Sequence, residues 1–285
     1  MPIAAITLAF DPILRLGDVA VRWQTVALVA VVFAGLVLAG LIARRNGLRP
    51  DDLLFIAVAA VPGAVVGGRL GYVLLHLDYY GSNKVAILDP AQGSLELALA
   101  VVGGVASGTY VATLLGAPVG AWLKAAAPSV LFVLGASKLA MLLGGAGQGQ
   151  PADAPWAIAF TGPGPWASLA PDVPSHPSQA YEGIFTLALL ALLTAAAMAG
   201  AFRRDDAQPF LVALAGWGLT RAAASTTWRD PTVAGPLGMG GLIALVVAAG
   251  AVAGWLLVAR RSGRVPADGT MRDVEWADPA ARPRF

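Results

Sequence analysis

Several reactive side chains stand together in residues 174–182, Pro-Ser-His-Pro-Ser-Gln-Ala-Tyr-Glu, where the chain enters a long apolar run. Histidine is the side chain best suited to proton transfer near neutral pH, so His176 could accept or donate a proton. Ser178, Tyr181 and Glu182 are spaced i, i+3 and i+4, and a helix would place them on one face. This spacing indicates a polar face at the start of an apolar helix, which could form part of a reactive site.

The same segment also has the features of an ordinary helix start. Ser175 or His176 suits the N-cap position. Pro177 suits the first helical position, where its missing N–H costs nothing. On this interpretation His176 is only a solvated residue at the mouth of the helix, and both interpretations stay open at the level of sequence.

Four charged residues fall well inside apolar runs, namely Arg69, Lys138, Glu182 and Arg221. Charge is costly in hydrocarbon, so each of them is a candidate functional residue. Three cations and one carboxylate at a similar depth would suit an anionic group, such as a lipid phosphate. The structural alternatives are that Arg69 and Lys138 extend to the membrane surface, and that Arg221 and Glu182 form an ion pair that only fixes helix packing.

The composition identifies the class of protein that must position these residues. Of 285 residues, 57% are hydrophobic and only 13% are charged, which is far from the average of soluble domains. Cysteine is absent and there are two histidines, which argues against a disulfide framework or a metal centre. The net charge of +2 does not indicate a nucleic-acid partner. The sequence therefore predicts an all-α polytopic membrane protein without a metal cofactor.

About seven apolar runs approach the length that spans a bilayer. They lie at residues 24–43, 53–75, 95–116, 120–143, 177–201, 209–228 and 238–259. We expect residues 1–23 to form an external or interfacial segment, and the tail at 260–285 to be mobile. Residues 144–176 form the longest predicted external loop, whose apolar part at 154–172 could be a lid over the site or an aromatic anchor.

Lys and Arg in the short loops predict the orientation of the spans. One set of loops carries Arg44, Arg45, Arg49, Lys124, Arg203, Arg204, Arg260, Arg261 and Arg264, whereas the other set carries only Lys84 and Arg229. Because basic loops favour the cytoplasm, we expect the C-terminus inside and, with an odd number of spans, the N-terminus outside. The four buried charges would then lie near the outer surface.

Several motifs together resemble the bacterial prolipoprotein diacylglyceryl transferases. They are His-Pro-Ser-Gln-x-Tyr-Glu at 176–182, Gly-Gly-Arg-Leu-Gly-Tyr-Val at 67–73, Phe-Asp-Pro at 10–12, Val-Ala-Val-Arg-Trp at 19–23, Gly-Trp-Gly-Leu-Thr-Arg at 216–221 and Leu-Gly-Met-Gly-Gly at 237–241. Their order covers nearly the whole chain. The resemblance implies a multi-pass protein of the bacterial cytoplasmic membrane with seven spans.

The resemblance also implies an activity and its partners. Such an enzyme moves the diacylglyceryl group of phosphatidylglycerol to the lipobox cysteine thiol of a preprolipoprotein signal peptide, without metal or nucleotide. We expect His176, Glu182 and Arg221 to be catalytic. The phospholipid would contact Lys138, Arg221, Arg69, Ser178, Gln179 and Tyr181.

Some family positions carry other residues in this chain. Lys138 stands where the resemblance implies an arginine, and Val102 where it implies a histidine. Other differences fall at Gln24, Met141, Gly144, Ala146 and Ser225. A homologue that is inactive, or that binds or moves anionic phospholipid without transferring a group, is therefore the alternative function, and a transporter built from two repeats is disfavoured because no repeat is visible.

Overall fold

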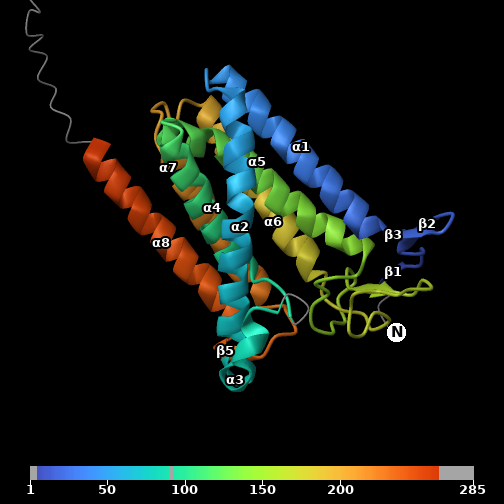
Figure 1. Ribbon diagram of the computed structural model, residues 1–285. Coiled ribbons are helices and arrows are strands. Elements are labelled where there is room, and N and C mark those ends of the chain that lie inside the picture. Colours follow the sequence, from blue (N-terminus) through green and yellow to red (C-terminus); the bar gives the residue numbers. More distant parts are fainter. Residues whose placement is uncertain (1–4, 90–92, 263–285) are drawn as a thin grey trace, which may run out of the picture.

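The computed structural model describes residues 5–89 and 93–262 and is dominated by helices (Figure 1). The helices are α1 (Trp23–Arg45), α2 (Pro50–Leu75), α3 (Leu77–Ser82), α4 (Leu97–Leu114), α5 (Val119–Ala140), α6 (Ser178–Met198), α7 (Gln208–Ser225) and α8 (Met239–Ser262), with 3-10 turns η1 (Lys84–Ile87) and η2 (Met141–Leu143). All seven predicted spans form helices. The predicted tail at 260–285 lies almost entirely outside the described residues.

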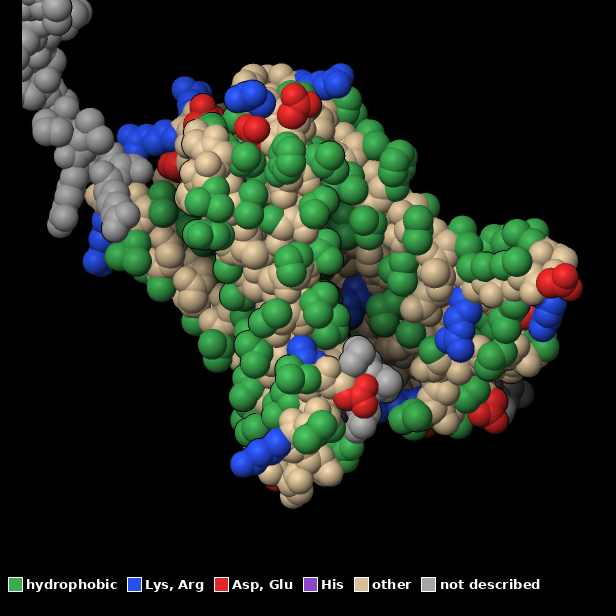
Figure 2. All heavy atoms as spheres, viewed as in Figure 1, with side chains coloured by type: hydrophobic (Ala, Val, Ile, Leu, Met, Phe, Trp, Pro, Cys, Tyr) green, Lys and Arg blue, Asp and Glu red, His purple; other side chains and the backbone are tan. Residues whose placement is uncertain are grey.

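Within residues 5–89 and 93–262, six helices are long and apolar enough to cross a membrane: α1, α2, α4, α5, α6 and α8. In the face shown in Figure 2, hydrophobic side chains cover the middle of the bundle, while Lys, Arg, Asp and Glu gather toward its ends. The helix α7 is less hydropathic and packs against α5, α6 and α8. Because neighbouring helices cover much of it, α7 can carry Arg221 and polar residues without meeting lipid. The predicted class, an all-α polytopic membrane protein, is confirmed.

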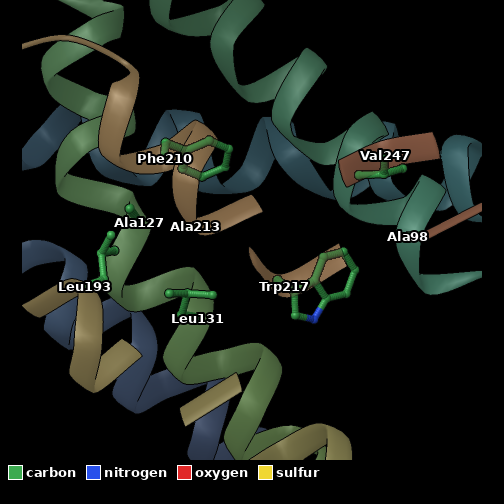
Figure 3. Packing of buried hydrophobic residues seen from close by; sticks show 8 residues of the cluster. All are labelled: Ala98, Ala127, Leu131, Leu193, Phe210, Ala213, Trp217 and Val247. Atoms are coloured by element: carbon green, nitrogen blue, oxygen red, sulfur yellow. The ribbon is translucent and has the colours of Figure 1, made fainter. Parts of the chain in front are cut away.

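The core of the bundle is built around α7. Trp217 and Phe210 lie almost fully buried beside Leu131 of α5 and Val247 of α8 (Figure 3). Aromatic rings bury a large apolar area and fill the space between helices that the many alanines leave. This packing fixes the rotation of α7 and, with it, the direction of Arg221 one turn after Trp217.

The helices α2 and α4 pack unusually closely because glycines line their contact. A Cβ atom added to Gly103 would lie 2.1 Å from the carbonyl oxygen of Gly63, and one added to Gly67 would lie 2.2 Å from that of Leu99. Small residues let helix backbones approach in membranes, where van der Waals contact drives association. The Gly-Gly-Arg-Leu-Gly motif therefore holds the start of α4 against α2.

The segments that connect the helices are short at one end of the bundle and longer, with β-strands, at the other end (Figure 1). Short turns at residues 46–49 and 115–118 and the loop 199–207 join the helices at one end. The other end carries the strands β1 (Ile6–Leu8), β2 (Ile13–Leu16), β3 (Val19–Arg22), β4 (Ile158–Phe160), β5 (Thr232–Ala234) and β6 (Leu237–Gly238). The strand β1 pairs in parallel with β4, β2 with β3 and β5 with β6. The predicted external segments thus fold onto one another at the strand-bearing end.

The loop at 144–176 is a folded layer fixed to the helix ends. Arg229, just after α7, donates from Nε to the carbonyl of Gly149 at 2.6 Å and from Nη2 to Ser175 Oγ at 3.0 Å. Gln148 donates to the carbonyls of Ile158 and Val173 at 2.9 and 3.1 Å. Residues 158–160 are buried, so the apolar part of the loop is packed, although Leu169 remains 94% exposed.

The predicted cap of α6 is wrong. The helix begins at Ser178 with Pro177 as the N-cap residue, and no side chain in the described part of the chain caps it. Ser175 instead donates from Oγ to the carbonyl of Val173 and accepts from Arg229. Its backbone is held in a pair of hydrogen bonds with Ile158, which keeps its hydroxyl away from the first turn of α6.

Candidate functional site

Four charged side chains, three from helices and one from the residue that caps a fourth helix, meet inside the bundle. Glu182 Oε2 lies 2.9 Å from Lys138 Nζ, and Glu182 Oε1 accepts from Arg221 Nη1 at 2.9 Å. Arg221 Nη2 lies 3.1 Å from Glu96 Oε1. The side chains of Glu182, Glu96 and Arg221 are 1%, 2% and 7% exposed, and that of Lys138 is 14% exposed. We call these four residues the buried tetrad.

The tetrad lies at one depth because each residue stands near the same end of its helix. Arg221 and Glu182 are each four residues from the end of α7 or the start of α6, which corresponds to about 6 Å along the helix axis. Lys138 is in the last turn of α5, and Glu96 immediately precedes α4. All four therefore lie close to the strand-bearing end of the bundle, as the sequence predicted for three of them.

Glu96 was missed by the count of buried charges made from sequence. It is the N-cap residue of α4, and its carboxylate accepts from the N–H groups of Ala98 and Leu99 at 2.9 and 2.7 Å. A charge at the boundary of an apolar run usually faces water, so the pattern alone gave no reason to bury it. The signal that could have found it is the N-cap position itself, since carboxylates there accept backbone N–H groups.

The glycines of α2 explain why Glu96 is buried. Its backbone N–H donates to the carbonyl of Gly68 at 2.8 Å. A Cβ atom on Gly71 would lie 2.8 Å from the Cβ of Glu96. Only glycine at position 71 leaves room for the side chain of Glu96. The glycine motif therefore allows the Glu96 carboxylate to pack against α2 and contact Arg221.

Arg69 is not part of the tetrad. Its Nε donates to the carbonyl of Ile87 at 2.7 Å, and its Nη2 donates to those of Ala86 and Asp89 at 2.6 and 3.0 Å. The guanidinium also lies 5.3 Å from the ring centroid of Tyr80. In this structure Arg69 fixes the turn that follows α3, and the tetrad holds two cations and two carboxylates instead of the net positive set that the sequence suggested.

The tetrad keeps hydrogen-bond donors that its carboxylates do not use. Arg221 Nε is buried and has no hydrogen-bond partner among the described residues. Lys138 forms an ion pair with Glu182, and an ammonium carries three N–H groups, more than one carboxylate oxygen can accept. The ring of Trp228 lies 4.7 Å from the Arg221 guanidinium and 6.0 Å from the Lys138 ammonium. These donors could bind an anionic oxygen beside the ring.

The residues at the start of α6 divide among different contacts. Ser178 Oγ bonds the backbone carbonyl and the hydroxyl of Thr227, at 3.1 and 2.6 Å. His176 Nδ1 lies 3.2 Å from the Tyr181 hydroxyl, and this hydroxyl accepts from Trp156 Nε1 at 2.7 Å. Of the three residues predicted to share one inward face, Ser178 and Glu182 are buried, Tyr181 is half-buried, and only Glu182 contacts the tetrad.

Gln179 is the unexplained member of this segment. Its side chain is 2% exposed, and neither its Oε1 nor its Nε2 has a hydrogen-bond partner among the described residues. A buried amide without partners is destabilising unless another group satisfies it. Gln179 is one turn before Glu182, so its amide lies on the side of the tetrad that faces the strand-bearing end.

Two of the positions that differ from the expected family pattern, Val102 and Gln24, have different surroundings in the structure. Val102 is 39% exposed, whereas Ala98, one turn earlier on α4, is fully buried and donates its N–H to Glu96. Val102 is therefore the more exposed of the two positions, and no contact of its side chain with the tetrad is seen among the described residues. Gln24 reaches over Gly144, where a Cβ atom would lie 2.0 Å from Gln24 Oε1.

Comparison with known proteins assigns the chain to a family. Residues 12–257 match the family described as prolipoprotein diacylglyceryl transferase. A phosphatidylglycerol–prolipoprotein diacylglyceryl transferase of Bordetella avium is 33% identical over 90% of this chain and 98% of its own length. The protein of the same name from Geobacter sulfurreducens is 31% identical over 82% of this chain and 89% of its own length. The chain belongs to the prolipoprotein diacylglyceryl transferase family.

Proposed function

We propose that this protein transfers the diacylglyceryl group of phosphatidylglycerol to the lipobox cysteine of a preprolipoprotein. The observation that carries the proposal is the buried tetrad, with unused donors on Arg221 and Lys138, in a chain that belongs to this family along nearly its whole length. The names of its relatives supply the two substrates and the transferred group.

The phosphate of the lipid would bind the free donors of the tetrad. Arg221 Nε and the remaining N–H groups of Lys138 lie beside Trp228. Beside the lower half of α2 the surface is hollowed, and atoms of a Lys or Arg side chain lie deep in the hollow (Figure 2). A lipid headgroup could enter there from the bilayer, and cations placed where charge grows on the leaving group would lower the barrier.

The transfer breaks the bond between the glycerol carbon of the diacylglyceryl group and the phosphate oxygen, and forms a thioether to the cysteine sulfur. The glycerol phosphate leaves with the bonding electrons, and the thiol proton needs an acceptor. We assign this role to His176. If its Nδ1–H donates to Tyr181, the lone pair on Nε2 is free to accept the proton. Glu182 accepts from Arg221 and forms an ion pair with Lys138, so its part is to hold these two cations.

The proposed arrangement in the membrane follows the predicted orientation. The strand-bearing end, with residues 1–23 and the loop 144–176, would face outward, where it meets the signal peptide and the outer leaflet. The opposite end and the tail from residue 260 would face the cytoplasm of a bacterial cell. Arg44, Arg45, Arg49 and Lys124 lie at that end, as the positive-inside rule requires.

The test is complementation of a transferase-depleted bacterium, followed by mass analysis of a reporter lipoprotein. The wild-type chain is expected to add a thioether-linked diacylglyceryl group. Lys138→Ala should lower the modification at least about tenfold, since it removes one phosphate ligand. Lys124→Ala is the matched control, because its ion pair with Asp205 lies at the other end of the bundle.

A folded wild-type chain that yields no thioether-linked product would contradict the proposal. Binding of phosphatidylglycerol that persists in that chain, and is lost in Lys138→Ala, would instead support the alternative of a protein that binds or moves anionic lipid. Native mass spectrometry of the detergent-solubilised protein distinguishes these outcomes.

A further inference from the structure

We propose that Glu96 is a positioning residue of the transfer site, which orients the Arg221 guanidinium and sets the charge of the site that receives the lipid phosphate. This inference rests on the proposed function. The evidence is the set of contacts made by Glu96. Its carboxylate accepts hydrogen bonds from the first turn of α4 and also forms an ion pair with Arg221.

The geometry fixes Arg221 from two sides. Nη1 is held by Glu182 and Nη2 by Glu96, which leaves Nε as the guanidinium nitrogen without a partner among the described residues. A guanidinium is planar, so two anchored nitrogens determine the direction of the third. Glu96 is itself immobilised by two backbone N–H groups and by its contact with Gly71. Arg221 Nε is therefore directed by the backbone of α4.

Glu96 also balances the charge of the tetrad. With Glu96 ionised, the two carboxylates equal the two cations Lys138 and Arg221. A neutral site binds an anionic phosphate through its unused donors and can release the more highly charged glycerol phosphate after transfer. Without Glu96 the site would carry one excess positive charge, and at low local dielectric constant this excess would hold both lipid and product more tightly.

Three substitutions separate these roles from simple helix capping. Glu96→Ser keeps an N-cap residue but removes the partner of Arg221. Glu96→Gln keeps the size of the side chain and removes its charge. Glu96→Asp keeps both cap and charge on a side chain shorter by one methylene, so it is the conservative control that should restore most of the activity.

The assay measures transfer from phosphatidylglycerol to a synthetic lipobox peptide by the purified protein, with far-ultraviolet circular dichroism and thermal unfolding of each variant as the folding control. For Glu96→Ser and Glu96→Gln we expect kcat to fall about 10- to 100-fold, as for a displaced substrate-binding group. The KM for phosphatidylglycerol should fall about five- to tenfold, because the site has gained positive charge. A purely structural role would lower the folded fraction and leave both constants of that fraction unchanged.

Unchanged kcat and KM in folded Glu96→Ser would overturn the proposal and leave Glu96 as a cap. A raised KM in Glu96→Gln would overturn the charge argument. If the wild-type chain transfers nothing, the proposed function fails, but Glu96 is still tested by native mass spectrometry with phosphatidylglycerol and with zwitterionic phosphatidylcholine. Glu96→Gln should then bind phosphatidylglycerol more tightly than wild type, with no gain for phosphatidylcholine, and equal affinities would refute the inference.

Discussion

Glu182→Gln is the substitution that most directly tests the tetrad as a source of stability. The wild-type carboxylate lies 2.9 Å from both Lys138 Nζ and Arg221 Nη1, and its side chain is 1% exposed. Removing one partner of a buried ion pair costs ~3–5 kcal/mol, because the remaining charge stays desolvated. In this variant Lys138 and Arg221 would share Glu96 alone, so we expect a loss in that range.

A double substitution shows whether charge balance is the cause. Glu182→Gln combined with Lys138→Met leaves Arg221 and Glu96 as one balanced pair. We expect the double variant to recover ~1–3 kcal/mol relative to Glu182→Gln, which is the range of coupling between contacting residues. The surface control is Asp205→Asn, whose carboxylate is 71% exposed and pairs with Lys124 at 2.9 Å. Exposed pairs contribute little, so its cost should stay below ~1 kcal/mol.

The measurement is the free energy of unfolding in detergent or bicelles, obtained by steric trapping or a reversible denaturant titration. Glu182→Gln within ~1 kcal/mol of wild type would show that the buried charges are not coupled as the structure places them. A double variant whose loss equals the sum of the two single losses would refute the charge-balance reasoning.

Three further predictions concern packing, the loop after α3 and the orientation. Gly103→Val should destabilise the protein by ~2 kcal/mol or more, because its Cβ would meet the carbonyl of Gly63, whereas Gly250→Ala, with nothing within 4 Å, should be neutral in the same unfolding assay. Arg69→Met should speed hydrogen exchange at residues 84–89, which lose hydrogen bonds to the guanidinium, and unchanged exchange there would contradict the assigned contact. The chain has no cysteine, so Leu169→Cys should react with a membrane-impermeant maleimide on intact cells and Asn46→Cys only after lysis, and the reverse pattern would overturn the orientation.

The helical membrane-spanning segments could be predicted from the sequence because the hydrocarbon core of a membrane restricts the structures that can cross it. Apolar runs of sufficient length must be helices in a membrane, since each backbone polar group needs an internal partner. The seven predicted segments are helices, and three of the four charges predicted within them, Lys138, Glu182 and Arg221, meet as expected for buried ions. The specific combination of motifs also identified the family that the comparison shows.

Tertiary structure decided how the charges are partnered. Arg69 and Arg221 are both arginines in apolar helices, yet one binds the carbonyls of a turn and the other two carboxylates. Glu96 joined the tetrad because Gly68 and Gly71 let α2 approach the start of α4. The pattern of apolar residues determines which segments form helices that span the membrane, because this depends on the local composition of each segment. Which charges meet depends on the rotation and spacing of helices distant in sequence, and these are set only by the packing of the whole bundle.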